Sequence, residues 1–178
     1  MKKFVVSLVL VLSSSLSNAN GFYGGIAYSL LESDITVMGT SFESEPSAFK
    51  LVGGASINKN FAIESVIGVG VKDDDIGPFD AEFELHHVFG LYGVGIFPAN
   101  DTLSLYGKVG VVSLEFEDVG GDKASGSGVG FGVGTEIKFT QHVSGALEYN
   151  LYPDVEYDDF DEIEVETKSI DFRFNFRF

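Results

Sequence analysis

The chain has 178 residues, no cysteine and a formal net charge of −16, from 27 acidic and 11 basic residues. The acidic excess excludes a nucleic-acid-binding protein, which needs a basic surface, and the absence of cysteine excludes disulfide frameworks and thiolate metal sites. A hydrophobic content of 44% is too high for a disordered chain. We therefore predict a folded acidic protein with no nucleic-acid partner and no cofactor.

The N-terminal segment has the pattern of a secretory signal peptide. Lys2 and Lys3 precede an apolar run from Phe4 to Leu12, and Ser17 and Ala19 place small residues at the −3 and −1 positions of a cleavage site. The apolar run is shorter than the ~20 residues that a membrane-spanning helix needs. We predict that residues 1–19 are removed on export and that residues 20–178 form one domain with a net charge of −18, because two lysines are lost.

After residue 20, apolar residues recur at every second position, which is typical of β-strands. The clearest example is 128–139, where Val129, Phe131 and Val133 alternate with glycines. The same alternation marks strands over 22–31, 48–57, 61–72, 83–97, 102–115, 143–152 and 170–178, although the register of 22–31 and 83–97 is not fixed by the pattern. The chain therefore contains eight predicted strands.

The connections between these strands alternate in length. Three are short, at 58–60, 98–101 and 140–142, and four are longer, at 33–47, 73–82, 117–127 and 153–165. In an up-and-down arrangement all the short turns lie at one end and all the long loops at the other. Short periplasmic turns with longer extracellular loops are typical of outer-membrane β-barrels. We predict an all-β, eight-stranded antiparallel up-and-down transmembrane barrel.

Two orientations of the strand faces are open: a soluble barrel of the lipocalin type has its apolar face inside, whereas a membrane barrel turns it toward lipid. The polar face favours the membrane barrel, because it is rich in glycine and almost balanced in charge, and charges removed from bulk water must be paired. We expect a polar network in the lumen made by Lys50, Glu64, Lys108, Glu136, Lys138, Glu148, Asp171, Arg173 and Arg177. We also expect an aromatic girdle near the turn end from Phe61, Phe139, Tyr149 and Phe178.

Several segments together resemble the eight-stranded outer-membrane barrels of the OmpA/opacity-protein type. They are the signal peptide, Phe22–Gly25, Leu105–Gly110, the glycine-rich strand Val129–Lys138, Leu147–Tyr149 and the terminal Phe178. The resemblance implies that Phe174, Phe176 and Phe178 form the C-terminal signal recognised by the barrel-assembly machinery. It also implies a location in the outer membrane, with lipid and lipopolysaccharide as neighbours. The resemblance covers the barrel and not a peptidoglycan-binding domain, so we do not expect anchoring to the cell wall.

The long loops are acidic and the histidines are few. Asp73–Asp75 and the run from Asp154 to Glu164 favour a solvated surface, with divalent cations at these loops as an open alternative. His86, His87 and His142 are the candidate catalytic groups, and His142 and Ser144 have the His-x-Ser spacing of a family of lipid A deacylases, although at the wrong end of the barrel. We predict a monomeric, non-enzymatic outer-membrane protein with a structural or surface-interaction role. The alternatives are a small-solute channel and a lipid A-modifying enzyme.

Overall fold

The computed structural model describes residues 21–37, 40–44, 46–72, 74–76, 81–118, 123–153, 155–157 and 160–178, with side chains described for 21–33, 46–71, 87–115, 126–153 and 166–178. The predicted signal peptide and the side chains of the acidic loops, including Asp73–Asp75, His86 and Asp154–Glu164, lie outside these residues. Among the described residues no helix is long and apolar enough to cross a membrane.

Eight long strands form the body of the molecule, and three short strands extend it. The long strands are β1 (Phe22–Val37), β3 (Ser47–Ser56), β4 (Phe61–Lys72), β6 (Ala81–Pro98), β7 (Leu103–Asp118), β8 (Lys123–Lys138), β9 (Val143–Leu151) and β11 (Phe160–Arg177). The short strands are β2 (Thr40–Ser44), β5 (Asp74–Ile76) and β10 (Val155–Tyr157).

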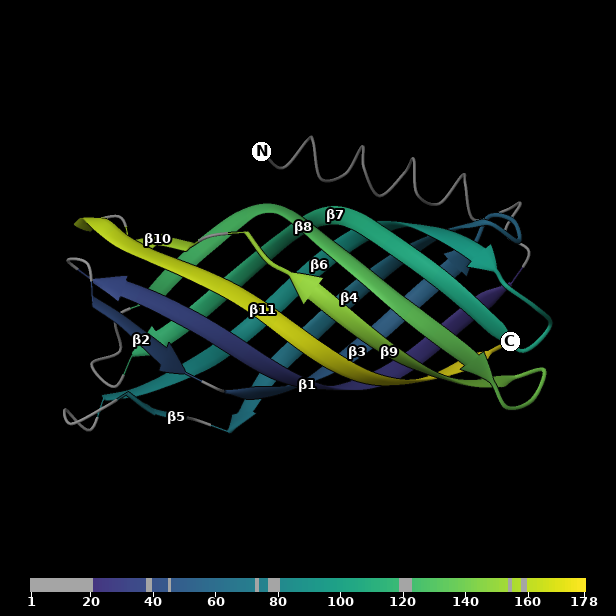
Figure 1. Cartoon of the computed structure of the whole chain (residues 1–178), viewed down its shortest axis with the longest axis horizontal. Coiled ribbons are helices and arrows are strands. Elements are labelled where there is room, and N and C mark those ends of the chain that lie inside the picture. Colours follow the sequence, from purple (N-terminus) through teal and green to yellow (C-terminus); the bar gives the residue numbers. More distant parts are fainter. Residues whose placement is uncertain are drawn as a thin grey trace.

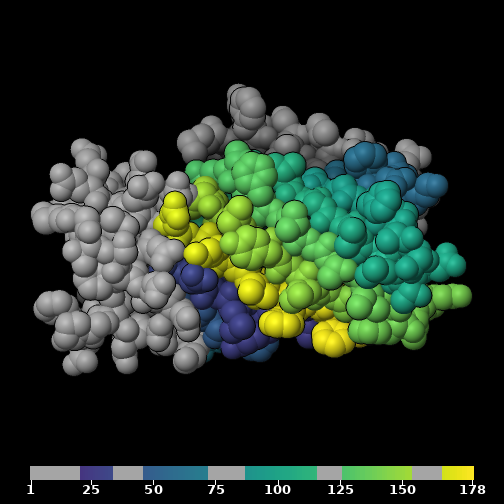
Figure 2. Space-filling model, viewed as in Figure 1, coloured from purple at the N-terminus to yellow at the C-terminus, as the bar shows by residue number. Residues whose placement is uncertain are grey.

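The long strands pair antiparallel in chain order, and the sheet closes on itself. The order is β1, β3, β4, β6, β7, β8, β9, β11, and β11 then pairs with β1 from Tyr23↔Arg177 to Val37↔Ile163. Figure 1 shows the strands crossing the molecule obliquely, and in Figure 2 yellow β11 lies between purple β1 and the green strands. Closure satisfies the backbone hydrogen bonds of every long strand, which a strand surrounded by lipid requires. The predicted eight-stranded antiparallel barrel is confirmed.

Several strands are longer at the loop end than the alternation predicts, so some of the expected loop boundaries were wrong. β1 continues to Val37 and β8 begins at Lys123, where the sequence predicted loops at 33–47 and 117–127. The β7–β8 ladder, for example, runs unbroken to Glu117↔Lys123. Apolar alternation stops where the strand leaves the apolar surroundings, but the backbone ladder needs only a partner strand. The hairpins therefore continue past the end of the pattern.

The three turns at the opposite end share one design. In each four-residue turn, two successive amides donate to the same carbonyl at the start of the next strand, as Ile57 and Asn58 do to Phe61 O at 2.9 and 3.2 Å. The side chains of Asn58, Asn100 and Thr140 each accept hydrogen bonds from two further amides of their turns. These side-chain caps replace the water that would otherwise satisfy the turn amides.

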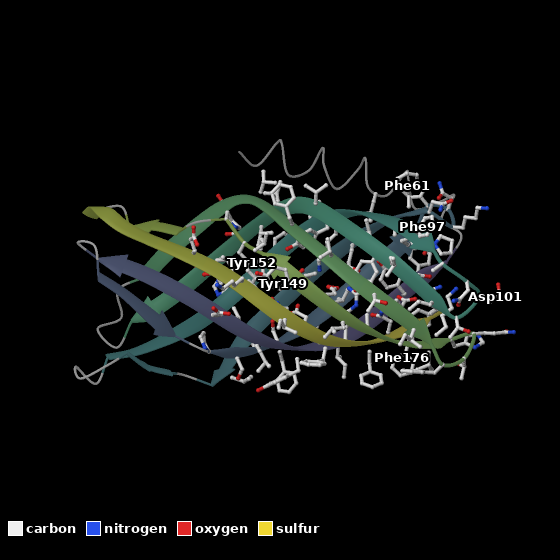
Figure 3. All side chains as sticks on the ribbon, viewed as in Figure 1. Phe61, Phe97, Asp101, Tyr149, Tyr152 and Phe176 are labelled. Carbon is white, nitrogen blue, oxygen red and sulfur yellow. The ribbon has the colours of Figure 1, made fainter. Side chains whose placement is uncertain are left out.

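The apolar face of the alternation points away from the barrel axis. Val129, Phe131 and Val133 are all more than half exposed, as are Phe172, Phe174 and Phe176, whereas the neighbouring charged residues are buried. The aromatic girdle expected from Phe61, Phe139, Tyr149 and Phe178 loses Tyr149 and gains Phe97 and Phe176. Phe61, Phe97 and Phe176 lie at the turn end, but Tyr149 lies midway along the barrel (Figure 3). Tyr149 lies six positions after the first residue of β9, so its depth, and not its residue type, removes it from the girdle.

Glycines on the inner face make room for the long side chains of the neighbouring strand. Gly132 lies directly opposite Lys108, and a Cβ at Gly132 would come within 2.7 Å of the Lys108 Cε atom. Gly134 lies opposite Tyr106 in the same way, and a Cβ there would come within 2.6 Å of the tyrosine ring. An eight-stranded barrel is just wide enough for side chains to fill it. Each glycine therefore determines which position on the neighbouring strand can hold a long luminal side chain.

Candidate functional site: the lumen of the barrel

Four charged side chains from four different strands meet in the middle of the lumen. Lys108 Nζ lies 2.7 Å from Glu148 Oε2 and 3.7 Å from Glu64 Oε1, and Arg173 Nη1 lies 2.9 Å from Glu64 Oε2 and 2.8 Å from Glu148 Oε1. Each cation thus contacts both carboxylates. We call Glu64, Lys108, Glu148 and Arg173 the central quartet. Its formal charge is zero, and every member is buried.

Tyrosines surround the central quartet. Tyr23 donates a hydrogen bond to Glu64 Oε2 at 3.0 Å, and Arg173 Nη2 donates to Tyr106 Oη at 3.4 Å. The Lys108 ammonium also lies over the ring of Tyr92, 4.7 Å from its centroid, which is within the range of a cation–π contact. These rings fill the width of the barrel around the ions, so the charged groups have protein partners in place of water.

A second ionic cluster lies on the loop side of the quartet. Lys50 Nζ lies 2.8 Å from Asp171 Oδ2 and donates to Tyr152 Oη at 2.5 Å. Ser29 and Ser169 donate hydrogen bonds to Asp171 Oδ1, the latter at 2.7 Å. Lys50 fits here because Gly68 lies directly opposite it on β4. The carboxylate of Asp171 is thus satisfied on both oxygens.

A third pair lies toward the turn end. Arg177 Nη2 lies 2.5 Å from Glu136 Oε1, and Asn175 Nδ2 donates to Glu136 Oε2 at 3.3 Å. Glu136 is buried, whereas the guanidinium of Arg177 is partly exposed. The three ionic groups occupy successive levels of the lumen, and within them four acidic and four basic side chains balance.

An apolar layer lies beyond the second cluster, toward the loop end. Val88, Val112 and Leu114 are at most 2% exposed and belong to one packed group with Leu31 and Ala48. These side chains lie on the inner face of their strands, so they make this level of the lumen unfavourable for water. A hydrophobic constriction of this kind opposes ion passage by dewetting.

Eight of the nine residues expected in the luminal network form ion pairs in the lumen, and Lys138 does not. Lys138 is half-buried near the turn end and makes no ion pair with any residue whose side chain is described. The luminal network also contains four tyrosines that were not predicted, Tyr23, Tyr92, Tyr106 and Tyr152. Tyr106 was on the polar face of its strand, so parity could have found it, but Tyr23 and Tyr92 lie in the two strands whose register the pattern left open.

The histidine candidates do not form a catalytic arrangement. Ser144 is buried in the lumen and its Oγ has no hydrogen-bond partner among the described residues, while His142 is exposed on the turn before it. His87 lies on the outer face, 3.1 Å from Glu115. Within the part of the chain whose side chains are described, no group of three or more His, Cys, Asp or Glu residues is placed to hold a metal ion.

Comparison with known proteins identifies the family. The model of the outer membrane protein beta-barrel domain matches residues 4–178. The chain belongs to this family. Among curated proteins none matches the chain in sequence.

Solved structures of outer-membrane barrels share the fold. Neisserial surface protein A is 16% identical with a TM-score of 0.61, and the match covers 88% of this chain and 97% of that one. Ail, the attachment invasion locus protein of Yersinia pestis, is 17% identical with a TM-score of 0.53, covering 89% and 99%. The outer membrane protease OmpT from Escherichia coli is 9% identical with a TM-score of 0.53, covering 90% and 97%. At these identities the likeness concerns the fold alone, which serves attachment proteins and a protease alike.

Proposed function

We propose that this protein is a non-enzymatic, closed outer-membrane barrel with a structural and surface-interaction role. The observation that carries the proposal is the filled lumen. Three ionic groups and an apolar layer of buried side chains succeed one another along the axis, which opposes a continuous watery path. The channel alternative needs such a path. The lipid A-modifying alternative needs a nucleophile with a base, and Ser144 has no such partner among the described residues.

The distribution of charge supports a role for the loop end in surface contacts. Twenty-two of the 27 acidic residues fall in 32–45, 73–84, 115–122 and 154–166, and only Lys72, Lys123 and Lys168 lie in or beside these segments. In an up-and-down barrel these segments share the loop end, which faces the cell exterior in this class of protein. An acidic surface attracts cationic partners and repels anionic ones.

The negative charge of the loop end argues against a sulphated ligand of the kind bound to Ail in its complex with the heparin analogue sucrose octasulfate. A cationic protein surface is the better match, and divalent cations would bridge the loops to the phosphates of neighbouring lipopolysaccharide. Phe174, Phe176 and Phe178 would serve during biogenesis as the signal for the barrel-assembly machinery.

Recordings from planar lipid bilayers test the proposal. Purified, heat-modifiable protein should insert without steady single-channel current, and the Lys108→Met variant should also remain silent, because the apolar layer stays in place. A steady open-channel current from the unmodified protein would replace the structural role with the channel alternative. Cell fractionation on the same preparation should place the protein in the outer membrane.

A further inference from the structure

The mouth of the barrel at the turn end contains a polar cavity that the proposed function does not use. Its volume is about 510 Å³, and its lining combines inward-facing residues of several strands with two of the turns. Its polar lining includes Lys59, Asn100, Asp101, Lys138 and Arg177. Asp101 marks this end of the barrel in Figure 3.

This cavity gathers positive charge in a strongly acidic chain. After the predicted removal of residues 1–19, nine basic residues remain, and Lys59, Lys138 and Arg177 line this one cavity. Glu136 neutralises Arg177. The remaining anionic groups on the lining are Asp101, which is exposed on its turn, and the α-carboxylate of Phe178. Neither is paired with Lys138, which is half-buried, lines the cavity and has no described counter-ion.

Hydrogen-bond donors lie beside this ammonium. Ser144 is directly opposite Lys138 in the β8–β9 ladder, is 2% exposed, and its Oγ has no partner among the described residues. Asn58 and Asn100 accept turn amides with their Oδ1 atoms, which leaves their Nδ2 groups as donors at the rim. Ser144 is not on the lining itself, but it is the cross-strand neighbour of the lining residue Lys138. Cations and amide donors around a polar cavity are the groups that recognise an oxyanion, since charge-assisted hydrogen bonds are the strong ones.

We propose that this cavity, with Lys138 as its principal cation and Ser144 as the cross-strand neighbour of that lysine, binds a small oxyanion, either a phosphate or a carboxylate, from the periplasmic side. The rest of the chain favours this end for an anion, because the acidic loops lie at the far end and the luminal ion pairs are balanced. The site is independent of the surface role, since it lies at the opposite end of the barrel. An anion here would also satisfy the Lys138 ammonium.

Nuclear magnetic resonance of the isotope-labelled full chain tests the proposal. The protein is refolded in a non-ionic detergent, so that no headgroup phosphate is present, and titrated with inorganic phosphate or with acetate. We expect saturable shifts of the amides in 57–60, 99–102 and 138–144 with at least one of the two anions. Lys138→Gln should weaken that binding about tenfold or more, as the loss of one charge-assisted hydrogen bond does, and Ser144→Ala should weaken it less.

Lys168→Gln is the matched control, because Lys168 has the same charge but lies at the other end of the barrel, 2.9 Å from Glu32. It should bind the anion like the unmodified protein. The proposal is overturned if neither anion gives saturable shifts, if Lys138→Gln binds as well as the unmodified protein, or if Lys168→Gln loses as much affinity as Lys138→Gln. A heat-modifiability gel on each variant confirms that the barrel is folded, and Lys138→Gln should fold because it removes no described ion pair.

Discussion

Replacing Lys108 with methionine should destabilise the barrel, because it leaves two buried carboxylates with one cation. The ammonium lies 2.7 Å from Glu148, 3.7 Å from Glu64 and over the ring of Tyr92, and methionine offers none of these charge interactions. Removing one partner of a buried ion pair costs ~3–5 kcal/mol. Arg173 still contacts both carboxylates, so we expect a value near the lower end, about 3 kcal/mol.

The assay is urea unfolding of the barrel in phospholipid vesicles, followed by the gel mobility of the folded form and by circular dichroism, since the chain has no tryptophan. With a urea dependence of about 2 kcal/mol per molar, the midpoint should fall by ~1.5 M. The double variant Lys108→Met with Glu148→Gln removes one charge of each sign and should recover much of the loss. An unchanged midpoint for Lys108→Met would refute the reasoning, because it would mean that Lys108 is solvated and the lumen is not the interior described above.

Three further predictions test other parts of the barrel. Val133→Arg should destabilise insertion by about 2–4 kcal/mol if Val133 faces the middle of the bilayer, and vesicle-refolding yields at normal levels would argue against a lipid-facing position. Gly132→Ala places a Cβ within 2.7 Å of Lys108, so we expect a loss of ~1–3 kcal/mol by urea unfolding. Gly107→Ala on the outer face meets nothing closer than 3.8 Å and should be neutral or stabilising by ~0.4–1 kcal/mol; equal effects of the two alanines would contradict the assignment of faces. Deleting Phe178 should lower the amount of folded protein in the outer membrane of cells without changing refolding in detergent, because only the cell uses the assembly signal. Equal losses in both assays would mean that Phe178 stabilises the barrel and is not part of that signal.

The two-residue alternation was sufficient to predict the strands and to separate their two faces, and the glycine content and charge balance of the polar face then indicated which face is inside. Parity put Val133 and Phe172 on one face and Glu148 and Arg173 on the other, because a β-strand turns successive side chains to opposite faces. The alternation of short and long connections predicted which ends of the strands lie together. The glycines opposite Lys108 and Tyr106 could be expected as a class, but their pairing with one particular long residue could not.

The sequence by itself determined the number of strands, their inner and outer faces and the excess of acid at one end, because these depend on local periodicity and composition. Only the tertiary structure decided which charges meet. Cross-strand register brings Lys108 and Arg173 onto the same two carboxylates and leaves Lys138 at the mouth without one. It also decided where the strands end, since a hydrogen-bonded ladder continues as long as a partner strand runs beside it, whether or not the side chains still alternate.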